Sequence, residues 1–424
     1  MRLNRACKII FSLALAAVAA WLGTSAQFYN EALVSAFFGI ALASVIIIHL
    51  RIRPSWQDVL WVLGGTSLLA SVDFSFLHFK PAMMAWLSFA GLTSLLVLGL
   101  RTVWSKQSER KLLLLAFIPS LLFVTSEYFA DSLLQWTSAV HPKVFDLYLF
   151  SFDSSLHLQI PFLVGQAFSM YPNLRAAGLI FYIGLPVSIA LIYSGRVLRA
   201  REKAIPSFAA FLATGPVGVL FYNLLPALGP VHLFGKTFPW HPLTVEQSSR
   251  LLAEPMALSG APNAIPSLHM AWVLLAWWYS RGLSWWERSV AFAFVFFTVL
   301  ATLGTGEHYF VDLVVAFPFA LLMEALCAFD LTVRERGRHT ALAVGLFATL
   351  AWLDALRYAP HFFWRSPAIS WILCAATVAV SLAFENKLWC AATFGGSESV
   401  AGAPVRAQFC ALFHDFENCR LRQQ

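Results

Sequence analysis

The sequence predicts an all-α polytopic membrane protein with about twelve transmembrane helices. Its 424 residues are 59% hydrophobic and only 12% charged, against roughly 25% charged residues in an ordinary soluble domain. Apolar runs recur along the chain at lengths near the roughly 20 residues that a bilayer-spanning helix needs. Short basic clusters separate many of these runs, as in a chain that crosses a membrane repeatedly.

The remaining composition argues against several other classes of protein. The formal net charge is +7, but the basic residues lie between apolar runs, so membrane topology explains them better than a nucleic-acid partner does. The six cysteines have no close pairs and predict no disulfide framework. Cys410, His414 and Cys419 lack a fourth ligand at a suitable spacing, so neither a metal nor another cofactor is expected.

Taken in order, the apolar runs divide the chain into four parts. The first run follows Arg2, Arg5 and Lys8, a pattern that fits a signal peptide or, as we favour, an uncleaved first span. The first predicted span ends at about Trp21. The other predicted spans lie at about 31–50, 57–78, 82–100, 112–135, 176–195, 206–226, 268–283, 289–305, 309–329, 340–358 and 367–385. The predicted parts are four accessory helices (1–111), a six-helix core (112–329) that contains the two motifs described below and is expected to be the catalytic part, two further helices (330–386) and a cytoplasmic tail (387–424).

The distribution of basic residues predicts the orientation of these spans. Of the 29 Lys and Arg residues, 18 lie in segments on the side of the N-terminus and 7 on the opposite side. Basic residues concentrate in cytoplasmic loops. We therefore expect both termini in the cytoplasm, and the ends of the spans near His269 and His308 on the outer (periplasmic or lumenal) face.

Two outer segments are too polar or too irregular to span. Residues 144–160 are aromatic but interrupted by polar groups, which predicts a segment lying in the membrane interface. The proline-rich segment from Gly229 to Ile265 is the longest outer connection. A loop of this length that leads into a candidate site is expected to be a lid or a wall.

A histidine and an aspartate stand at the outer start of the predicted span 309–329. Asp312 follows His308 by four residues, so both side chains lie on one helical face within hydrogen-bonding reach. The carboxylate can accept the Nδ1 proton and leave Nε2 free for nucleophilic or acid–base chemistry. Alone, the pair is a weak signal, because two interfacial polar residues without a catalytic role would give the same pattern.

A second motif precedes the predicted span 268–283. Proline, a serine able to cap the helix and His269 in its first turn place backbone N–H groups and an imidazole at one helix N-terminus. Such a terminus attracts anions, which makes Ser267 a candidate substrate-binding residue. One inward and one outward helix separate the two motifs, so His269 and His308 are expected at the same surface.

These motifs resemble the second and third signatures of the type 2 phosphatidic acid phosphatase superfamily. The forms Pro-Ser-Leu-His and Gly-x-His-Tyr-x-x-Asp are similar to its inositol phosphotransferase branch, which includes inositol phosphorylceramide synthases; the similarity is best between Asn263 and Asp312. The resemblance implies that His308 attacks phosphorus to form a phosphohistidine. It also implies that Asp312 orients His308, that His269 protonates the leaving oxygen and that no metal takes part.

The superfamily's first signature, a lysine followed by Arg-Pro, has no match here. The corresponding outer span end runs from Tyr222 to Pro230. Lys236 and Arg250, in the following outer loop, are the nearest candidates for neutralising a phosphate. Asn223 either contacts the phosphate or bonds within the helix bundle.

The sequence thus predicts a membrane enzyme that transfers or hydrolyses a lipid phosphoester at the outer face. The expected partner is a membrane lipid of the phospholipid, ceramide, diacylglycerol or polyprenyl phosphate class. One alternative is a twelve-helix transporter, although no repeat relates the two halves. Another is a catalytically inactive structural member of the same family.

Overall fold

Helices form the framework of the molecule. The computed structural model describes residues 12–13, 36–76, 83–250, 254–332 and 335–394. Within these ranges no strand occurs, and the pairing of Val144 with Met256 is an isolated bridge. A helix satisfies its own backbone hydrogen bonds, which the lipid interior demands. The predicted all-α class is confirmed.

Several helices fit an integral membrane protein. Six helical segments of the described chain are long and apolar enough to cross a membrane: 85–104, 185–222, 285–304, 310–327, 336–358 and 367–393. The number of about twelve spans stays a prediction. The predicted first span and most of the predicted tail lie outside the described residues.

Two predicted spans take a different form. The predicted span 176–195 consists of two helices, α9 (Pro172–Ile183) and α10 (Leu185–Ala200), which meet at Gly184. Helix α14 (Leu268–Tyr279) has 12 residues. At 1.5 Å per residue it is about 18 Å long, shorter than the roughly 30 Å of a bilayer's hydrocarbon core.

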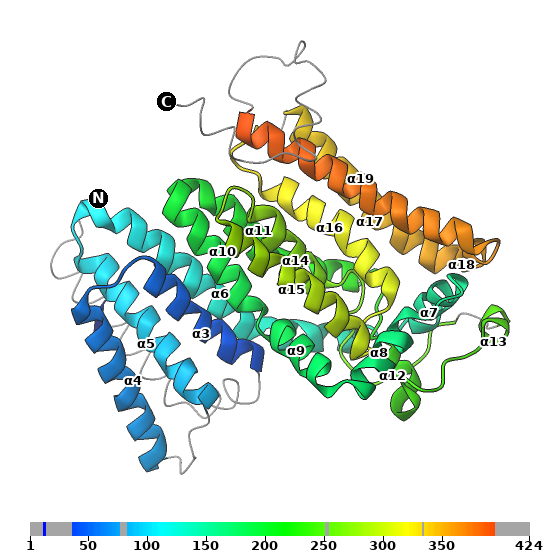
Figure 1. Cartoon of the computed structure of the whole chain (residues 1–424), viewed down its shortest axis with the longest axis horizontal. Coiled ribbons are helices and arrows are strands. Elements are labelled where there is room, and N and C mark those ends of the chain that lie inside the picture. The colour runs from blue at the N-terminus through cyan, green and yellow to red at the C-terminus, as the bar shows by residue number, and fades with distance from the viewer. Residues whose placement is uncertain (1–11, 14–35, 77–82, 251–253, 333–334, 395–424) are drawn as a thin grey trace.

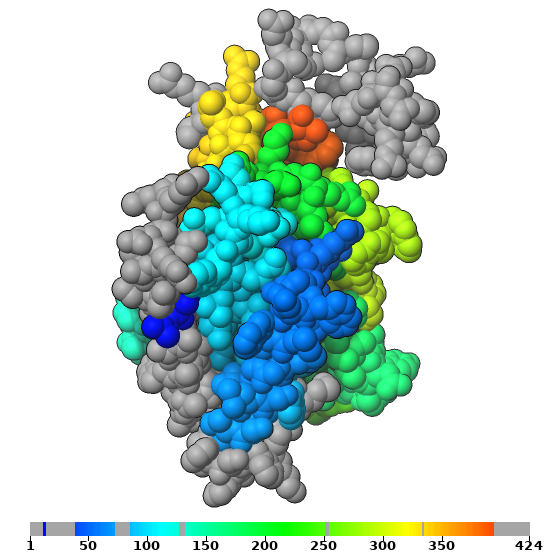
Figure 2. Space-filling model, turned by 90° about the vertical axis from the view of Figure 1, so that its left-hand side faces the viewer, coloured from blue at the N-terminus to red at the C-terminus, as the bar shows by residue number. Residues whose placement is uncertain are grey.

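The N-terminal helices pack as a group beside the rest of the molecule (Figure 1). Figure 2 looks at this side and shows them covering much of it. Buried Asp58 on α4 pairs with Arg101 on α5 at 2.7 Å, which ties two of these helices together. The helices are α3 (Ala36–Arg51), α4 (Trp56–Phe76), α5 (Met83–Trp104) and the longer α6 (Gln107–Val140).

The centre of the molecule is built around α16 (Phe310–Cys327). Of the residues in this helix, 83% are buried. In the most apolar stretch of the peripheral C-terminal span 367–393 the share is 17%. It packs against α11 and α14 and against two later helices. An apolar helix with buried residues on all sides is a core helix. Around it lie η1 (Arg201–Ala204), α11 (Ile205–Tyr222) and α15 (Trp285–Gly304), together with α10 and α14.

The last helices cover the outside of α16. A Cβ added to Gly345 would lie 2.7 Å from the backbone nitrogen of Leu322, so only glycine allows this close helix contact. Arg281, in the turn before α15, pairs with buried Glu385 at 2.6 Å. These helices are α17 (Arg336–Tyr358), α18 (Pro360–Phe363) and α19 (Pro367–Phe394).

Short helices gather at one end of the bundle (Figure 1). Residues 144–160, expected in the membrane interface, instead contain α7 (Asp146–Ser155), and eight of its ten residues are buried. Helices α12, α13 and α18 pack against it and cover it. The other short elements here are α8 (Ile160–Met170), α12 (Pro230–Phe234), η2 (Gly235–Thr237) and α13 (Val245–Ser249).

Candidate active site

His308 lies in the tight turn between α15 and α16. Helix α15 ends at Gly304 and α16 begins at Phe310. Gly306 has a φ of 77°, a conformation that glycine adopts without steric cost. The backbone N–H of His308 donates to the carbonyl of Thr302 at 3.3 Å. The turn thereby folds back over the end of α15 and leaves the His308 side chain only 3% exposed.

Three groups surround the His308 imidazole. Its Nδ1 lies 2.9 Å from the carbonyl oxygen of Ala264 and 3.4 Å from Oδ2 of Asp312. Its Nε2 lies 3.2 Å from Oγ of Ser267. A carbonyl oxygen only accepts hydrogen bonds, so Nδ1 carries a proton, and in the neutral imidazole Nε2 then has the lone pair. The Ser267 hydroxyl then donates to that lone pair.

Asp312 is fully buried in the first turn of α16. Its Oδ2 accepts a hydrogen bond from the backbone N–H of Tyr309 at 2.8 Å besides facing His308. Its Oδ1 has no hydrogen-bond partner among the described residues. A carboxylate is stabilised at a helix N-terminus by the unpaired N–H groups and the helix dipole. Asp312 and the Ala264 carbonyl thus fix the ring orientation jointly.

Ser267 joins the two sequence motifs directly. It is the N-cap of α14, and its Oγ accepts from the backbone N–H of Met270 at 3.4 Å. Its own N–H donates to the backbone carbonyl of Asp312 at 3.2 Å. The N-terminus of α14 therefore lies beside Nε2 of His308, where its N–H groups can bind an anion.

His269 follows two residues after Ser267, in the first turn of α14. Its ring stacks on Tyr182 with centroids 4.0 Å apart and planes at 19°. Trp272 meets the same ring edge-on at 6.1 Å and 89°. Aromatic contacts of this kind restrict the ring plane. Unlike buried His308, His269 is partly exposed.

The described parts of the proline-rich segment, residues 229–250 and 254–265, pack against the His308 turn. The N–H of Val231 donates to the carbonyl of Gly306 at 2.9 Å, and the N–H of Ala264 donates to Ala227 at 3.0 Å. Gly229 has a φ of 137°, and an added Cβ would lie 2.4 Å from the carbonyl oxygen of Glu307. Only glycine permits this close approach.

Asn223 is bonded within the helix bundle. Its Oδ1 lies 2.9 Å from Nε2 of His141, at the end of α6. Its Nδ2 donates to the carbonyl of Val219 at 2.7 Å. The sequence left two alternatives open for this amide, a phosphate contact or a bond within the bundle. In the structure the amide is engaged by these contacts within the bundle.

The two candidate cations of the outer loop lie at the surface. Lys236 is an exposed residue of η2. Arg250 is exposed at the end of α13 and pairs with Glu246 at 2.6 Å. No hydrogen bond or ion pair between described residues links either cation to His308 or Asp312. Their role in binding phosphate stays a prediction.

Two buried aspartates of α7 support the site, and sequence reasoning did not single out either. Asp146 accepts from the backbone N–H of Gly229 at 2.8 Å and from the Tyr309 hydroxyl at 3.0 Å. Burial raises the pKa of Asp146 to about 6, although these hydrogen bonds act in the opposite direction. Asp146 thus connects the outer loop to the residue that follows His308.

Asp153 caps the helix that carries Asp312. Its carboxylate oxygens accept from the backbone N–H groups of Phe310 at 2.7 Å and Val311 at 3.1 Å. Burial raises the pKa of Asp153 well above its usual range. The spacing of the two aspartates could have indicated them in the sequence. Asp146 and Asp153 are seven residues apart, which puts both on one face of a helix.

His232 is a further polar group beside the motif. Its Nε2 lies 3.8 Å from Oε2 of Glu307, and its Nδ1 lies 3.2 Å from the carbonyl of Ser259. The nearby carboxylate of Glu307 raises the pKa of His232. In the sequence, His232 is indicated by its position in the same proline-rich segment as Lys236.

Residues 147–326 match the family model of the PAP2 superfamily. This match supports the superfamily assignment. It spans both motifs and all of α7 except Asp146, and it falls inside the predicted core. No curated protein and no solved structure matches the chain. A match to this superfamily suggests a phosphatase-type membrane enzyme, and a lipid-type phosphoester in the membrane fits such a protein as substrate.

Proposed function

We propose that the protein is a lipid phosphotransferase or phosphatase that works through a phosphohistidine on Nε2 of His308. The observation that carries the proposal is the 3.2 Å contact between Ser267 Oγ and His308 Nε2. In the tautomer with a protonated Nδ1, this contact supports Nε2 as a nucleophile beside the N-terminus of α14, where a phosphate would be held. The superfamily match of residues 147–326 supports the same reaction class.

The first half-reaction uses both histidines. Nε2 of His308 forms a bond to phosphorus while the bond from phosphorus to the leaving oxygen breaks. His269, in its protonated form, gives its proton to that oxygen. The imidazole becomes cationic when it is phosphorylated, and the Ala264 carbonyl and Asp312 accept hydrogen bonds from its Nδ1–H group. The Ser267 hydroxyl turns from Nε2 to a phosphate oxygen.

The second half-reaction decides between transfer and hydrolysis. Either water or a lipid hydroxyl attacks phosphorus, the nitrogen–phosphorus bond breaks, and neutral His269 takes the proton of the attacking oxygen. The developing charge on phosphate is stabilised by the N–H groups of α14. The two branches differ only in the acceptor that reaches the site.

A serine hydrolase is a second candidate, because serine, histidine and aspartate are also in contact in that class of enzyme. In this chain Ser267 is fully buried and its Oγ accepts the N–H of Met270 as a helix cap. The lone pairs with which a serine would attack are thus partly engaged in this cap. The cap geometry and the superfamily match favour phosphoryl transfer to His308.

The finer assignment follows from the motif forms. Pro-Ser-Leu-His269 and His308-Tyr309 resemble the inositol phosphotransferase branch, so we propose a head group or phosphoryl group passed between lipids. We place the reaction at the outer membrane face, because basic residues are concentrated on the opposite side. The predicted substrates are phospholipid, ceramide, diacylglycerol or polyprenyl phosphate lipids.

The proposal is tested by incubating the purified protein with labelled lipid phosphates, with and without diacylglycerol or ceramide. A transferase yields a labelled second lipid that depends on the acceptor. A phosphatase yields inorganic phosphate with or without it. Absence of both products with the wild-type chain, under conditions that keep it folded, contradicts the proposal and favours a transporter or a structural role.

A further inference from the structure

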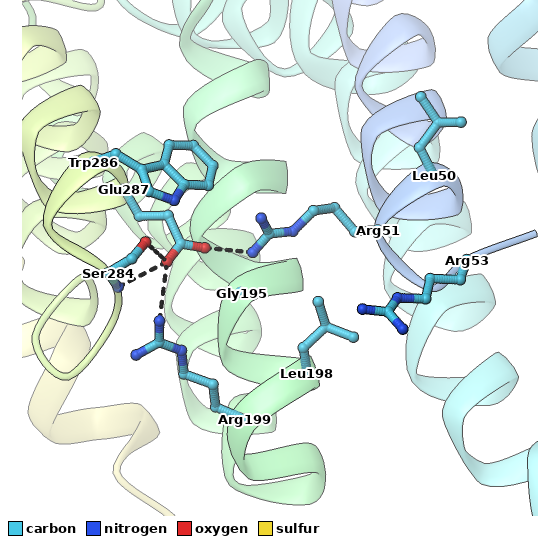
Figure 3. Close-up of a pocket in the computed structure, with 9 residues that line it drawn as sticks. All are labelled: Leu50, Arg51, Arg53, Gly195, Leu198, Arg199, Ser284, Trp286 and Glu287. Atoms are coloured by element: carbon cyan, nitrogen blue, oxygen red, sulfur yellow. Dashed lines mark hydrogen bonds and ion pairs between the residues drawn. The ribbon is translucent and has the colours of Figure 1, made fainter.

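A cavity of about 430 Å³ opens at the far end of the bundle from His308. It lies where α3 ends, where the last turns of α10 run and where α15 begins (Figure 3). Its lining consists of Leu50, Arg51, Arg53, Gly195, Leu198, Arg199, Ser284, Trp286 and Glu287.

The cavity is remote from the candidate active site. Trp286 and Glu287 are in the first turn of α15, whereas His308 follows the end of that 20-residue helix. At 1.5 Å per residue the helix is about 30 Å long, close to the thickness of a bilayer's hydrocarbon core. The cavity and His308 therefore lie near opposite membrane faces, and one ligand cannot contact both.

A buried carboxylate holds two of the arginines in place. Glu287 is 2% exposed, and it pairs with Arg51 and, at 3.5 Å, with Arg199. The N–H of Ser284 donates to the same carboxylate at 2.9 Å. A Cβ on Gly195 would lie 2.6 Å from Oε1 of Glu287, so glycine provides the space for this cluster. The arginines are preorganised, which lowers the entropic cost of binding.

The cavity keeps an excess of positive charge. Three arginines face one carboxylate, and Figure 3 shows Arg53 across the cavity from the pair formed by Glu287 and Arg199. Within the described chain Arg53 has no ion pair or side-chain hydrogen bond. Its φ of 59° is rare for a residue other than glycine. Such strained positions concentrate at functional sites.

The rim of the cavity is apolar and exposed. Leu50 is 60% exposed, Leu198 46% and Trp286 40%. The guanidinium of Arg51 lies 5.5 Å from the centre of the Trp286 ring. Tryptophan beside arginine, next to exposed leucines, is typical of the boundary between lipid headgroups and acyl chains. A phosphate would meet the arginines while an acyl chain covers the leucines.

We propose that this cavity binds the phosphate of an anionic lipid headgroup at the membrane face opposite His308. Guanidinium groups bind phosphate through paired, charge-assisted hydrogen bonds. Free phosphate shares that chemistry, but it makes no use of the exposed Leu50, Leu198 and Trp286. The apolar rim therefore favours a lipid as the source. This site does not depend on the function proposed for His308.

The test measures binding to the full-length protein in detergent by native mass spectrometry. The probes are dioctanoyl phosphatidylglycerol, dioctanoyl phosphatidylcholine and inorganic phosphate. We expect a saturable phosphatidylglycerol adduct, weaker binding of phosphatidylcholine and no saturable binding of phosphate alone. Arg53→Gln should weaken phosphatidylglycerol binding about tenfold, as expected for one lost charge-assisted contact.

Lys203→Gln is the matched control, because Lys203 is an exposed cation just beyond α10 and outside the cavity. It should change binding less than about twofold, the scale of screened surface charge. Equal loss in both variants, or no loss with Arg53→Gln, overturns the proposal. Inorganic phosphate that saturates the site as tightly as the lipid overturns the lipid assignment. Unchanged elution and an unchanged unfolding temperature of both variants show that each is folded.

Discussion

The hydroxyl of Ser267 lies 3.2 Å from Nε2 of His308, although 41 positions separate the two residues in the sequence. The same serine caps α14 and donates its N–H to the backbone of Asp312. One residue thus sets the position of the proposed nucleophile relative to the proposed phosphate site.

We predict that Ser267→Ala lowers both turnover and stability. Loss of an N-cap costs about 1 kcal/mol. Loss of a hydrogen bond to a transferring phosphate should lower kcat by about 10²-fold, the lower range for a removed oxyanion donor. Turnover and thermal unfolding measure the two effects.

Thr244→Ala is the control for Ser267→Ala. Thr244 caps α13 by accepting from the N–H of Gln247 at 3.2 Å, away from His308. It should lose stability and keep turnover. If the two variants lose the same fraction of activity, Ser267 has only a structural role.

Asp312→Asn should reduce turnover less than His308→Ala does. The Ala264 carbonyl still holds the Nδ1 proton at 2.9 Å, so the ring keeps its orientation while the negative charge is lost. That charge stabilises the imidazolium as it forms. Rapid-quench kinetics should show a slower rise of phosphoenzyme in Asp312→Asn, with the final level retained. A variant as inactive as His308→Ala would mean that Asp312 alone orients the ring.

Asp146 should make the fold more sensitive to pH between about 4 and 6. Its pKa is raised from 3.8 to about 6, chiefly by burial, so the folded state binds the proton more tightly than the unfolded state. The contribution of this group to stability is full below pH 3.8 and is lost as the pH rises through 6. Asp146→Asn imitates the protonated form and should remove this part of the dependence.

The measurement for Asp146 is the unfolding midpoint as a function of pH, taken as the difference between Asp146→Asn and wild type. Other carboxylates cancel in that difference. The variant should gain stability relative to wild type as the pH rises from 4 to 6. A difference that is flat over this range would show that the Asp146 carboxylate titrates normally.

A cysteine at position 259 should react with an impermeant reagent from the outer side of intact cells. Ser259 is an exposed residue of the proline-rich segment, and its carbonyl oxygen lies 3.2 Å from Nδ1 of His232. The positive-inside rule places this loop outside. Labelling seen only after the membrane is opened would invert the topology. A cysteine in place of exposed Lys203, at the opposite end, is the control and should show the reverse pattern.

The long helices could be predicted because each of them contains a run of apolar residues that is recognisable in the sequence by itself. The residues of α11, α15 and α16 form continuous hydrophobic stretches, and the structure places helices there. Helix α14 ends after 12 residues, before the predicted end at residue 283. A run of apolar residues marks burial in lipid or in protein alike, so it does not determine the length of a helix.

The partners of the site residues could not be predicted in the same way. His308 and Asp312 are four residues apart, so their contact followed from helical spacing. The Ala264 carbonyl and the ring of Tyr182 reach their histidines only through tertiary packing. Asp153 is 157 positions from the N–H of Phe310 that it caps, so no local pattern contains this contact.

Trapping of a labelled phosphoenzyme by acid or alkaline quench tests the central claim most directly. The account predicts an acid-labile, alkali-stable adduct in wild type that disappears in His308→Ala. His269→Ala should keep the adduct with an activated aryl phosphate and lose about 10²- to 10⁴-fold in rate with an alkyl lipid phosphate, which needs a proton to leave. An adduct that persists in His308→Ala and disappears in His269→Ala would contradict the assignment.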